Sequence, residues 1–458
     1  MLIDFSVANF RSFGAEQTLN LVASGKLKDH GDHCIAVGDT GKSVLRSGVV
    51  YGANAAGKSN LVRAVLFAQG FIQGSIPFAR LTLDHFRFSK KKKPSTFEFR
   101  YLVDGRLFVY GFSITATEVV EEWLDATSAT GRDVNVFSRK GQEISIGNLK
   151  PFSSDGEGSA KALKAMKLLP ARADQLLLNK IVDQPQSHRG ELLNRAVWWF
   201  TDCLTVIQAD SSFQPLIEFV NQEGGFRHFA GAFLHHVGTG INYLHVERSE
   251  IDAEKIPTEL LQGLQAPKGH ETRIVLSPGV SLQLDPKDPT KVVRSNLTAR
   301  HQVKKSDYSI PFQDESDGTQ RCLNLLPALY HLTTGRKVFV IDEIDRSLHP
   351  LLCHALLKLF VESCPGACQQ MIVTTHETHL LDLKLLRRDE IWFVEKDDKQ
   401  QTQVYSLADL KVRNDVRIEK GYLQGRFGGI PFIGDTKRLM DMIQSPTDGN
   451  ANAKKTTS

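Results

Sequence analysis

The sequence lacks several features that would place it in a specialised class of protein. Its 458 residues include six cysteines, scattered along the chain. Cys364 and Cys368 come closest to a ligand pair, but no second pair and no suitably spaced histidines complete a zinc site. We therefore expect buried or idle thiols and the reducing environment of the cytoplasm.

Long apolar runs and a leader segment are also missing. No run approaches the roughly 20 residues needed to cross a bilayer. Residues 1–4 have neither a basic leader nor an apolar core, so we expect no signal peptide and no membrane partner. The formal net charge of +4 is small for this length. It is compatible with a DNA partner without indicating one, since nucleic-acid surfaces show a much larger basic excess.

The composition is that of an ordinary globular protein, with 41% hydrophobic and 24% charged residues. The length predicts two or three lobes. A β-rich pattern over 81–146, with a hairpin signal at Asp104-Gly105, precedes a mainly helical one. Alternating strand and helix patterns from 323 onwards predict a parallel sheet. We predict four segments: an N-terminal half-domain with a β-subdomain (1–158), a helical insertion (159–268), a C-terminal half-domain (269–432) and a flexible tail (433–458).

The most specific motif is a glycine-bearing loop between a predicted strand and a predicted helix. Residues 52–59 fit the pattern G-x-x-x-x-G-K-S, in which backbone amides and a helix N-terminus surround phosphate groups. Lys58 would reach the β- and γ-phosphates of ATP, and Ser59 would bind Mg²⁺. A chance glycine-rich turn is the ordinary alternative, which the flanking strand and helix disfavour. The predicted nucleotide contacts are Gly52, Asn54, Ala56, Gly57, Lys58, Ser59 and Asn60.

A second acidic motif follows an apolar run at 338–341. Asp342 is predicted to hold Mg²⁺, and Glu343, one residue beyond the strand end, to polarise the attacking water. An apolar run that ends in Asp-Glu is common, and alone it would indicate only a capped strand. Together with the phosphate loop it indicates catalysis.

Three further segments specify the subclass. Residues 316–320, Ser-Asp-Gly-Thr-Gln, resemble the signature loop of ABC ATPases, in which Ser316 and Gly318 would cap the γ-phosphate bound to another subunit. Asp345 lies in the D-loop position (344–350), and His376, after a predicted strand, lies in the position of the switch histidine. Each short motif alone is weak evidence for this subclass, because Ser-x-Gly commonly starts a helix and a lone histidine commonly ends a strand. Their order and spacing favour the functional interpretation.

This order has a mechanical consequence. In the ABC arrangement the signature serine of a subunit cannot reach the nucleotide of the same subunit. ATP would therefore lie between Lys58 of one chain and Ser316 of its twin. Binding of ATP would favour a homodimer, and hydrolysis would weaken it.

The sequence resembles the RecF/SMC-like branch of ABC ATPases near its start, at 9–13 (Asn-Phe-Arg-Ser-Phe). The motifs at 315–321, 342–350 and 422–431 resemble the AbiLii-like AAA/ABC ATPases of bacteria. The resemblance implies an α/β fold: an ABC-type P-loop NTPase head with an antiparallel β-subdomain and a helical insertion. We find no clear Q-loop between Phe67 and Phe112.

The resemblance also implies a biological role. Similar ATPases belong to anti-phage and abortive-infection systems, beside an RloB-like or other Toprim-type nuclease. The related OLD nucleases carry a Toprim domain after the ATPase, but the segment after His376 lacks a separate Glu and an Asp-x-Asp set. Any cutting residues would belong to another chain. A RecF-like ATPase acting directly on DNA is the alternative, and the long stretch between Lys58 and Ser316 disfavours a transporter subunit.

Overall fold

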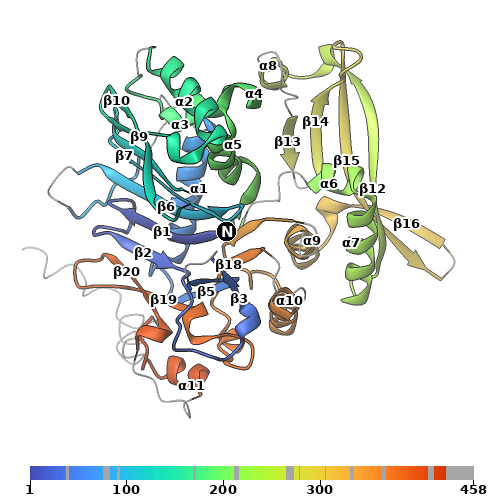
Figure 1. Cartoon of the computed structure of the whole chain (residues 1–458). Coiled ribbons are helices and arrows are strands. Elements are labelled where there is room, and N and C mark those ends of the chain that lie inside the picture. Colours follow the sequence, from blue (N-terminus) through green and yellow to red (C-terminus); the bar gives the residue numbers. More distant parts are fainter. Residues whose placement is uncertain are drawn as a thin grey trace, which may run out of the picture.

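The structure is a computed structural model that describes residues 1–37, 41–75, 83–89, 93–128, 130–168, 172–210, 216–264, 273–277, 279–304, 306–330, 335–362, 368–410 and 417–429. The predicted tail at 433–458 lies outside these residues. Two sheets and the helices between and around them build the main body, and a third sheet forms a lobe beside it (Figure 1). No helix in the described ranges is long and apolar enough to cross a bilayer.

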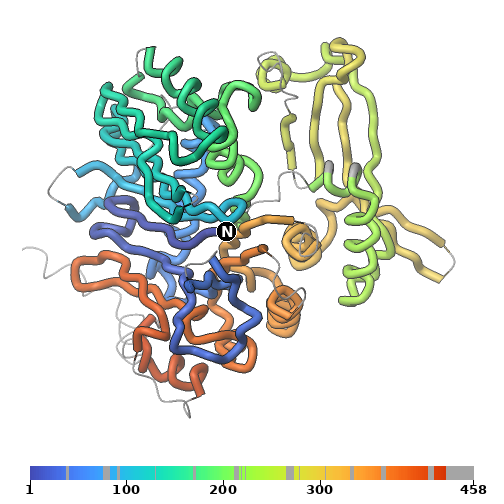
Figure 2. Tube along the Cα trace, in the orientation of Figure 1, coloured from blue at the N-terminus to red at the C-terminus, as the bar shows by residue number. Residues whose placement is uncertain are grey.

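The central sheet is parallel except at one edge, with the order β11-β17-β18-β5-β19-β20. Chain segments far apart in sequence meet here, since β5 near the N-terminus lies between β18 and β19 (Figure 2). Short apolar runs form these strands, as expected for a sheet covered on both faces. Their bounds are β5 Ser47–Gly52, β11 Leu204–Ile207, β17 Val338–Ile341, β18 Gln370–Thr374, β19 Ile391–Lys396 and β20 Thr402–Ser406.

Side chains alternate between the two faces of the central sheet. Val50 and Val340 join the core that includes α1 and the antiparallel sheet, whereas Val49 and Ile341 join the core that includes α9 and α10. Helices thus cover both faces and leave the carboxyl ends of the parallel strands to form the site. The helices in these layers are α1 Lys58–Gln73, α9 Asp317–Tyr330, α10 Pro350–Glu362 and α11 Ile418–Leu423.

The antiparallel sheet has the order β10-β9-β8-β7-β6-β1-β2. The predicted hairpin is present between β6 and β7, where Asp104 and Gly105 have φ values of 49° and 77°, the positive pair that a tight hairpin turn uses. Helices α2–α5 pack against this sheet at the top of Figure 1. The strands are β1 Leu2–Ala8, β2 Gln17–Asn20, β6 Ser95–Val103, β7 Arg106–Ile114, β8 Val119–Thr127, β9 Asp133–Lys140 and β10 Glu143–Ile146; β3 Cys34–Ala36 and β4 Ser43–Leu45 pair separately.

The predicted α/β class with an antiparallel β-subdomain is confirmed. The segment 159–268 is not the helical insertion that we predicted. Its strand β11 pairs with β17 in the central sheet, and its strand β12 pairs with β15 in the third sheet. Short apolar runs such as 204–207 fit a strand and a buried helix equally well, so the sequence pattern missed β11.

The lobe formed by the third sheet contains strands from both sides of the predicted boundary at 268. The helix α7 packs on β12, and β16 pairs with β15 before the chain enters α9. The remaining bounds are α2 Ser154–Lys167, α3 Leu177–Val182, α4 Gln186–Arg189, α5 Glu191–Trp198, α6 Leu216–Gln222, α7 Gly224–His236, α8 Thr258–Leu264, β12 Ile241–Asp252, β13 Arg273–Ser277, β14 Val280–Leu284, β15 Lys291–Val303 and β16 Ser306–Pro311.

Candidate nucleotide site

The phosphate loop connects β5 directly to α1. Ala55 and Gly57 take positive φ values of 64° and 124°, which let the chain reverse direction before the helix begins. A Cβ on Gly57 would lie 2.2 Å from Oγ1 of Thr402, and one on Gly52 would lie 2.4 Å from the carbonyl oxygen of Val394. Close packing against β19 and β20 therefore requires both glycines, and the loop conformation also requires Gly57. Asn54 lies exposed at the loop tip, and Ala56 is buried beneath it.

Lys58 points back into the loop that precedes it. Its Nζ donates to the carbonyl oxygens of Gly52 at 2.7 Å and Ala53 at 3.2 Å, and lies 3.4 Å from Nδ1 of His376. Burial lowers its pKa to about 8, although nearby carboxylates, led by Glu343, oppose the change. A partly desolvated ammonium gains more from an added anion than one in bulk water would.

Ser59 and Asp342, the two predicted metal ligands, lie side by side. Oγ of Ser59 donates to Oδ1 of Asp342 at 3.3 Å, and Oγ1 of Thr374 donates to the same oxygen at 2.6 Å. Serine hydroxyl and carboxylate oxygens are the hard ligands that Mg²⁺ prefers. These residues therefore fit a magnesium ion held jointly with phosphate oxygens.

Glu343 occupies a strained backbone position directly after this carboxylate. Its φ is 47°, a region that costs a non-glycine residue on the order of 1 kcal/mol or more. Its amide donates to Oγ1 of Thr374 at 2.8 Å, so the neighbouring strand end fixes the turn. Among the carboxylates, that of Glu343 raises the pKa of Lys58 most, so its negative charge lies near the ammonium.

His376 completes this edge of the sheet. Its amide and the hydroxyl of Thr375 both donate to Asp345, at 3.3 Å and 2.8 Å. Partial burial lowers the pKa of His376, and the positive charge of Lys58 lowers it further. The imidazole is therefore neutral at pH 7 and can accept a hydrogen bond.

The signature residues lie at the start of α9, beside the D-loop. Oγ of Ser316 accepts the amide of Thr319 at 3.2 Å and so starts α9, while Ser316 itself stays exposed. A Cβ on Gly318 would lie 2.7 Å from the carbonyl oxygen of Ser347, so this residue packs against the D-loop. Among the described residues, no hydrogen bond joins Ser316 or Gly318 to the phosphate loop. The structure brings the other predicted residues together and leaves these two apart.

The sequence did not reveal which hydrogen bonds support the loop from behind. Oγ1 of Thr402 lies 2.8 Å from both the carbonyl oxygen of Ala56, to which it donates, and Oγ of Ser12, and the side-chain amide of Asn60 donates to the same serine at 2.8 Å. Asn60 thus anchors α1 to the segment after β1. Arg11 in that segment forms an ion pair with Asp84 at 2.9 Å. Arg11 and Ser12 belong to the 9–13 motif and Asn60 to the predicted nucleotide contacts, but no local pattern indicates that these side chains support the loop.

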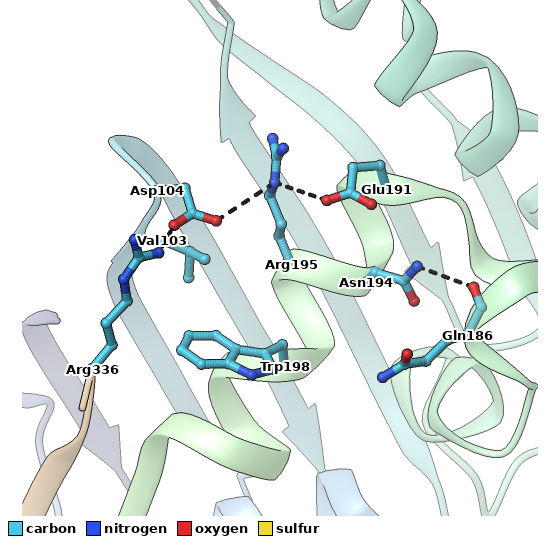
Figure 3. A pocket seen from close by; sticks show the side chains of 8 residues that line it. All are labelled: Val103, Asp104, Gln186, Glu191, Asn194, Arg195, Trp198 and Arg336. Carbon is cyan, nitrogen blue, oxygen red and sulfur yellow. Dashed lines mark hydrogen bonds and ion pairs between the residues drawn. The ribbon is translucent and has the colours of Figure 1, made fainter. Parts of the chain in front are cut away.

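A separate hollow of about 300 Å³ lies between the β6–β7 hairpin and α5 (Figure 3). Arg195 contacts Glu191 at 3.2 Å and Asp104 at 3.8 Å, and Arg336 also contacts Asp104. Its charged groups therefore compensate one another, and the hollow offers a phosphate group no surplus of positive charge.

The sheet and the loop between β5 and α1 define a P-loop nucleotide-binding protein. The chain belongs to the family described as "AAA domain, putative AbiEii toxin, Type IV TA system", which matches residues 49–382. That range contains every residue predicted to contact nucleotide or metal.

Three solved structures are similar over most of their length. The SMC head domain from Thermotoga maritima is 12% identical, with 90% of this chain and 99% of that chain covered and a TM-score of 0.38. The SmcHead bound to the C-winged helix domain of ScpA is 14% identical, with coverage of 88% and 97% and a TM-score of 0.35. The recombination mediator protein RecF is 12% identical, with coverage of 88% and 98% and a TM-score of 0.30. The search of curated proteins found no match.

Proposed function

We propose that this chain is a Mg²⁺-dependent ATPase that closes as a homodimer around two ATP molecules. The observation that carries the proposal is the convergence of Lys58, Ser59, Asp342 and His376 at the carboxyl edge of one sheet. Lys58 would neutralise phosphate charge, Ser59 and Asp342 would hold Mg²⁺, and Glu343 would orient and deprotonate water. Bound Mg²⁺ would supply further neutralisation of the phosphates.

The exposed position of the signature serine supports the proposed dimer. Among the described residues no hydrogen bond joins Ser316 to the phosphate loop of its own chain, so a second copy would have to bring the two together. Each nucleotide would then form part of the interface, so ATP would tighten the dimer.

A complementation experiment tests this arrangement. A Lys58→Ala chain keeps its signature loop, and a Ser316→Ala chain keeps its phosphate loop. Each variant alone should lack turnover, but a mixture should regain part of the wild-type ATPase activity, because a mixed dimer contains one complete site. A mixture that regains none, together with full activity in a strictly monomeric wild-type preparation, would refute the dimer.

We also propose that this ATPase controls a separate nuclease or toxin in anti-phage defence. The family description, which names a putative AbiEii toxin and a toxin–antitoxin system, supports a defence role. Expression of the native operon should recover a neighbouring protein with the purified chain. Recovery of the chain alone, with ATP-dependent DNA binding that weakens steeply with salt, would favour the RecF-like alternative instead.

A further inference from the structure

Arg321 lies on α9 shortly after the signature serine and is buried, with 6% of its surface exposed. Its guanidinium donates to three backbone carbonyl oxygens: Gln208 at 3.0 Å, Asp342 at 2.6 Å and Glu343 at 3.0 Å. The acceptors belong to the ends of two adjacent strands, β11 and β17, which a backbone bond from Asp342 to Ile207 also joins. One side chain of the signature helix therefore reaches the peptide units that carry the metal and water ligands.

The contact restrains a turn that is already strained. The amide of Glu343 is held by Thr374 and its carbonyl by Arg321, so the peptide groups on both sides of the positive φ are fixed. Burial lowers the pKa of Arg321, and the charge of Arg346 lowers it further. The carboxylates of Asp342, Glu343 and Asp345 oppose this change, so the cation is held by local charge as well as by its carbonyl acceptors.

We propose that Arg321 is a positioning residue that couples the signature helix of a chain to the Asp342–Glu343 turn of the same chain. When Ser316 caps the nucleotide of the twin, α9 and this turn would settle together, so that capping of one site raises the rate of hydrolysis at the other. The coupling rests on the proposed dimer, because Ser316 at the start of α9 would contact a nucleotide only across the interface. The close approach of Gly318 to Ser347 ties the start of α9 to the D-loop in the same unit.

The chain offers a matched control for this arginine. Arg46 is also fully buried and donates to backbone carbonyls, those of Val361 at 3.2 Å and Phe360 at 3.4 Å. It precedes β5 and so lies at the amino ends of the parallel strands, whereas the site lies at their carboxyl ends. Lysine at either position keeps the charge but loses the planar fork that bonds several carbonyls at once.

The test compares Arg321→Lys with Arg46→Lys in full-length protein. We expect both to lower the melting temperature. Arg321→Lys alone should lower kcat by about tenfold or more while changing the Kd of Mg-ATP by less than about threefold, the pattern of an interaction that matters in the transition state. Equal kcat values for the two variants would overturn the coupling. A wild-type protein without dimer-dependent turnover would instead overturn the proposed function itself.

Hydrogen exchange on the wild-type protein gives a second measurement that does not depend on the folding of a variant. As protein concentration rises in Mg-ATP, amides at 317–321 and at 343–345 should become protected with one common midpoint. Separate midpoints for the two segments would contradict a coupled unit.

Discussion

Lys58 is the residue whose removal should act most directly on nucleotide binding. Its ammonium already bonds the carbonyls of Gly52 and Ala53 and is positioned to turn toward a phosphate. Lys58→Ala should weaken ATP binding by about 100-fold or more, because a desolvated charged hydrogen bond contributes several kcal/mol. Titration with a fluorescent ATP analogue measures this, with Lys164→Ala, an exposed lysine of α2, as the control. Unchanged affinity would remove Lys58 from the site.

The pH dependence of binding follows from the same lysine. Burial lowers its pKa to about 8 from 10.5, and bound phosphate prefers the protonated form. Affinity should therefore be full below pH 8 and fall above it, by about tenfold per pH unit at most, because the free protein must take up a proton to bind ATP. The lowered pKa of His376 keeps that ring neutral across this range.

Titrations of ATP between pH 7 and 9.5 check this dependence. Lys58→Arg is the matched comparison, because arginine stays charged throughout and should give a flatter profile. A wild-type Kd that stays constant to pH 9.5 would show that the lysine is not the titrating group.

At the scale of elements, β20 supports the phosphate loop through a side-chain hydrogen bond. Thr402 bonds the carbonyl of Ala56 and the hydroxyl of Ser12 at once. Thr402→Val keeps the shape and removes both bonds, leaving a buried carbonyl without this donor. We expect a loss of about 1–3 kcal/mol in unfolding free energy and weaker ATP binding.

The control for this substitution lies in the antiparallel sheet. Thr96 bonds the hydroxyl of Ser113 at 2.8 Å, away from the site, so Thr96→Val removes one comparable contact. Urea denaturation and ATP titration of both variants separate stability from binding. If Thr402→Val binds ATP no worse than Thr96→Val, β20 supports the fold alone.

The elements also show which parts of the site the sequence could predict. Lys58, Asp342 and His376 were predicted because each follows a strand within a short motif, and the carboxyl ends of parallel strands meet at one edge. Ser12 and Thr402 contribute single hydroxyls from segments far apart in the chain. No local pattern predicts that these two hydroxyls meet, because their contact arises from the pairing of distant strands.

The fold was predictable to a similar degree. The β6–β7 hairpin and the alternation from β17 to β19 follow from turn residues and apolar runs. The sequence pattern did not predict the two strands in 159–268, for different reasons. β11 is too short for its periodicity to be recognised, and β12 is largely exposed and charged along its second half. Their assignment depends on partners, β17 and β15, that lie far downstream.

At the scale of the whole molecule, the proposed dimer separates ATP binding from ATP hydrolysis. In that dimer Glu343 would act on water, whereas Lys58, Ser59 and Asp342 would contact phosphate and metal. Loss of the carboxylate charge should therefore stop turnover and leave binding intact. Because ATP would hold the two chains together until it is cleaved, the variant should accumulate as a closed dimer.

Glu343→Gln tests this expectation. Glutamine keeps the size and the side-chain oxygen but cannot accept a proton at pH 7, so kcat should fall by about 100-fold or more. Sedimentation in Mg-ATP should show a dimer that reverts to monomer when EDTA removes Mg²⁺, and Glu362→Gln, an exposed glutamate of α10, should behave as wild type. Normal turnover would remove Glu343 from its role as base. A variant that binds ATP without turnover yet sediments as a monomer would show instead that the base is correct and that a second copy does not complete the site.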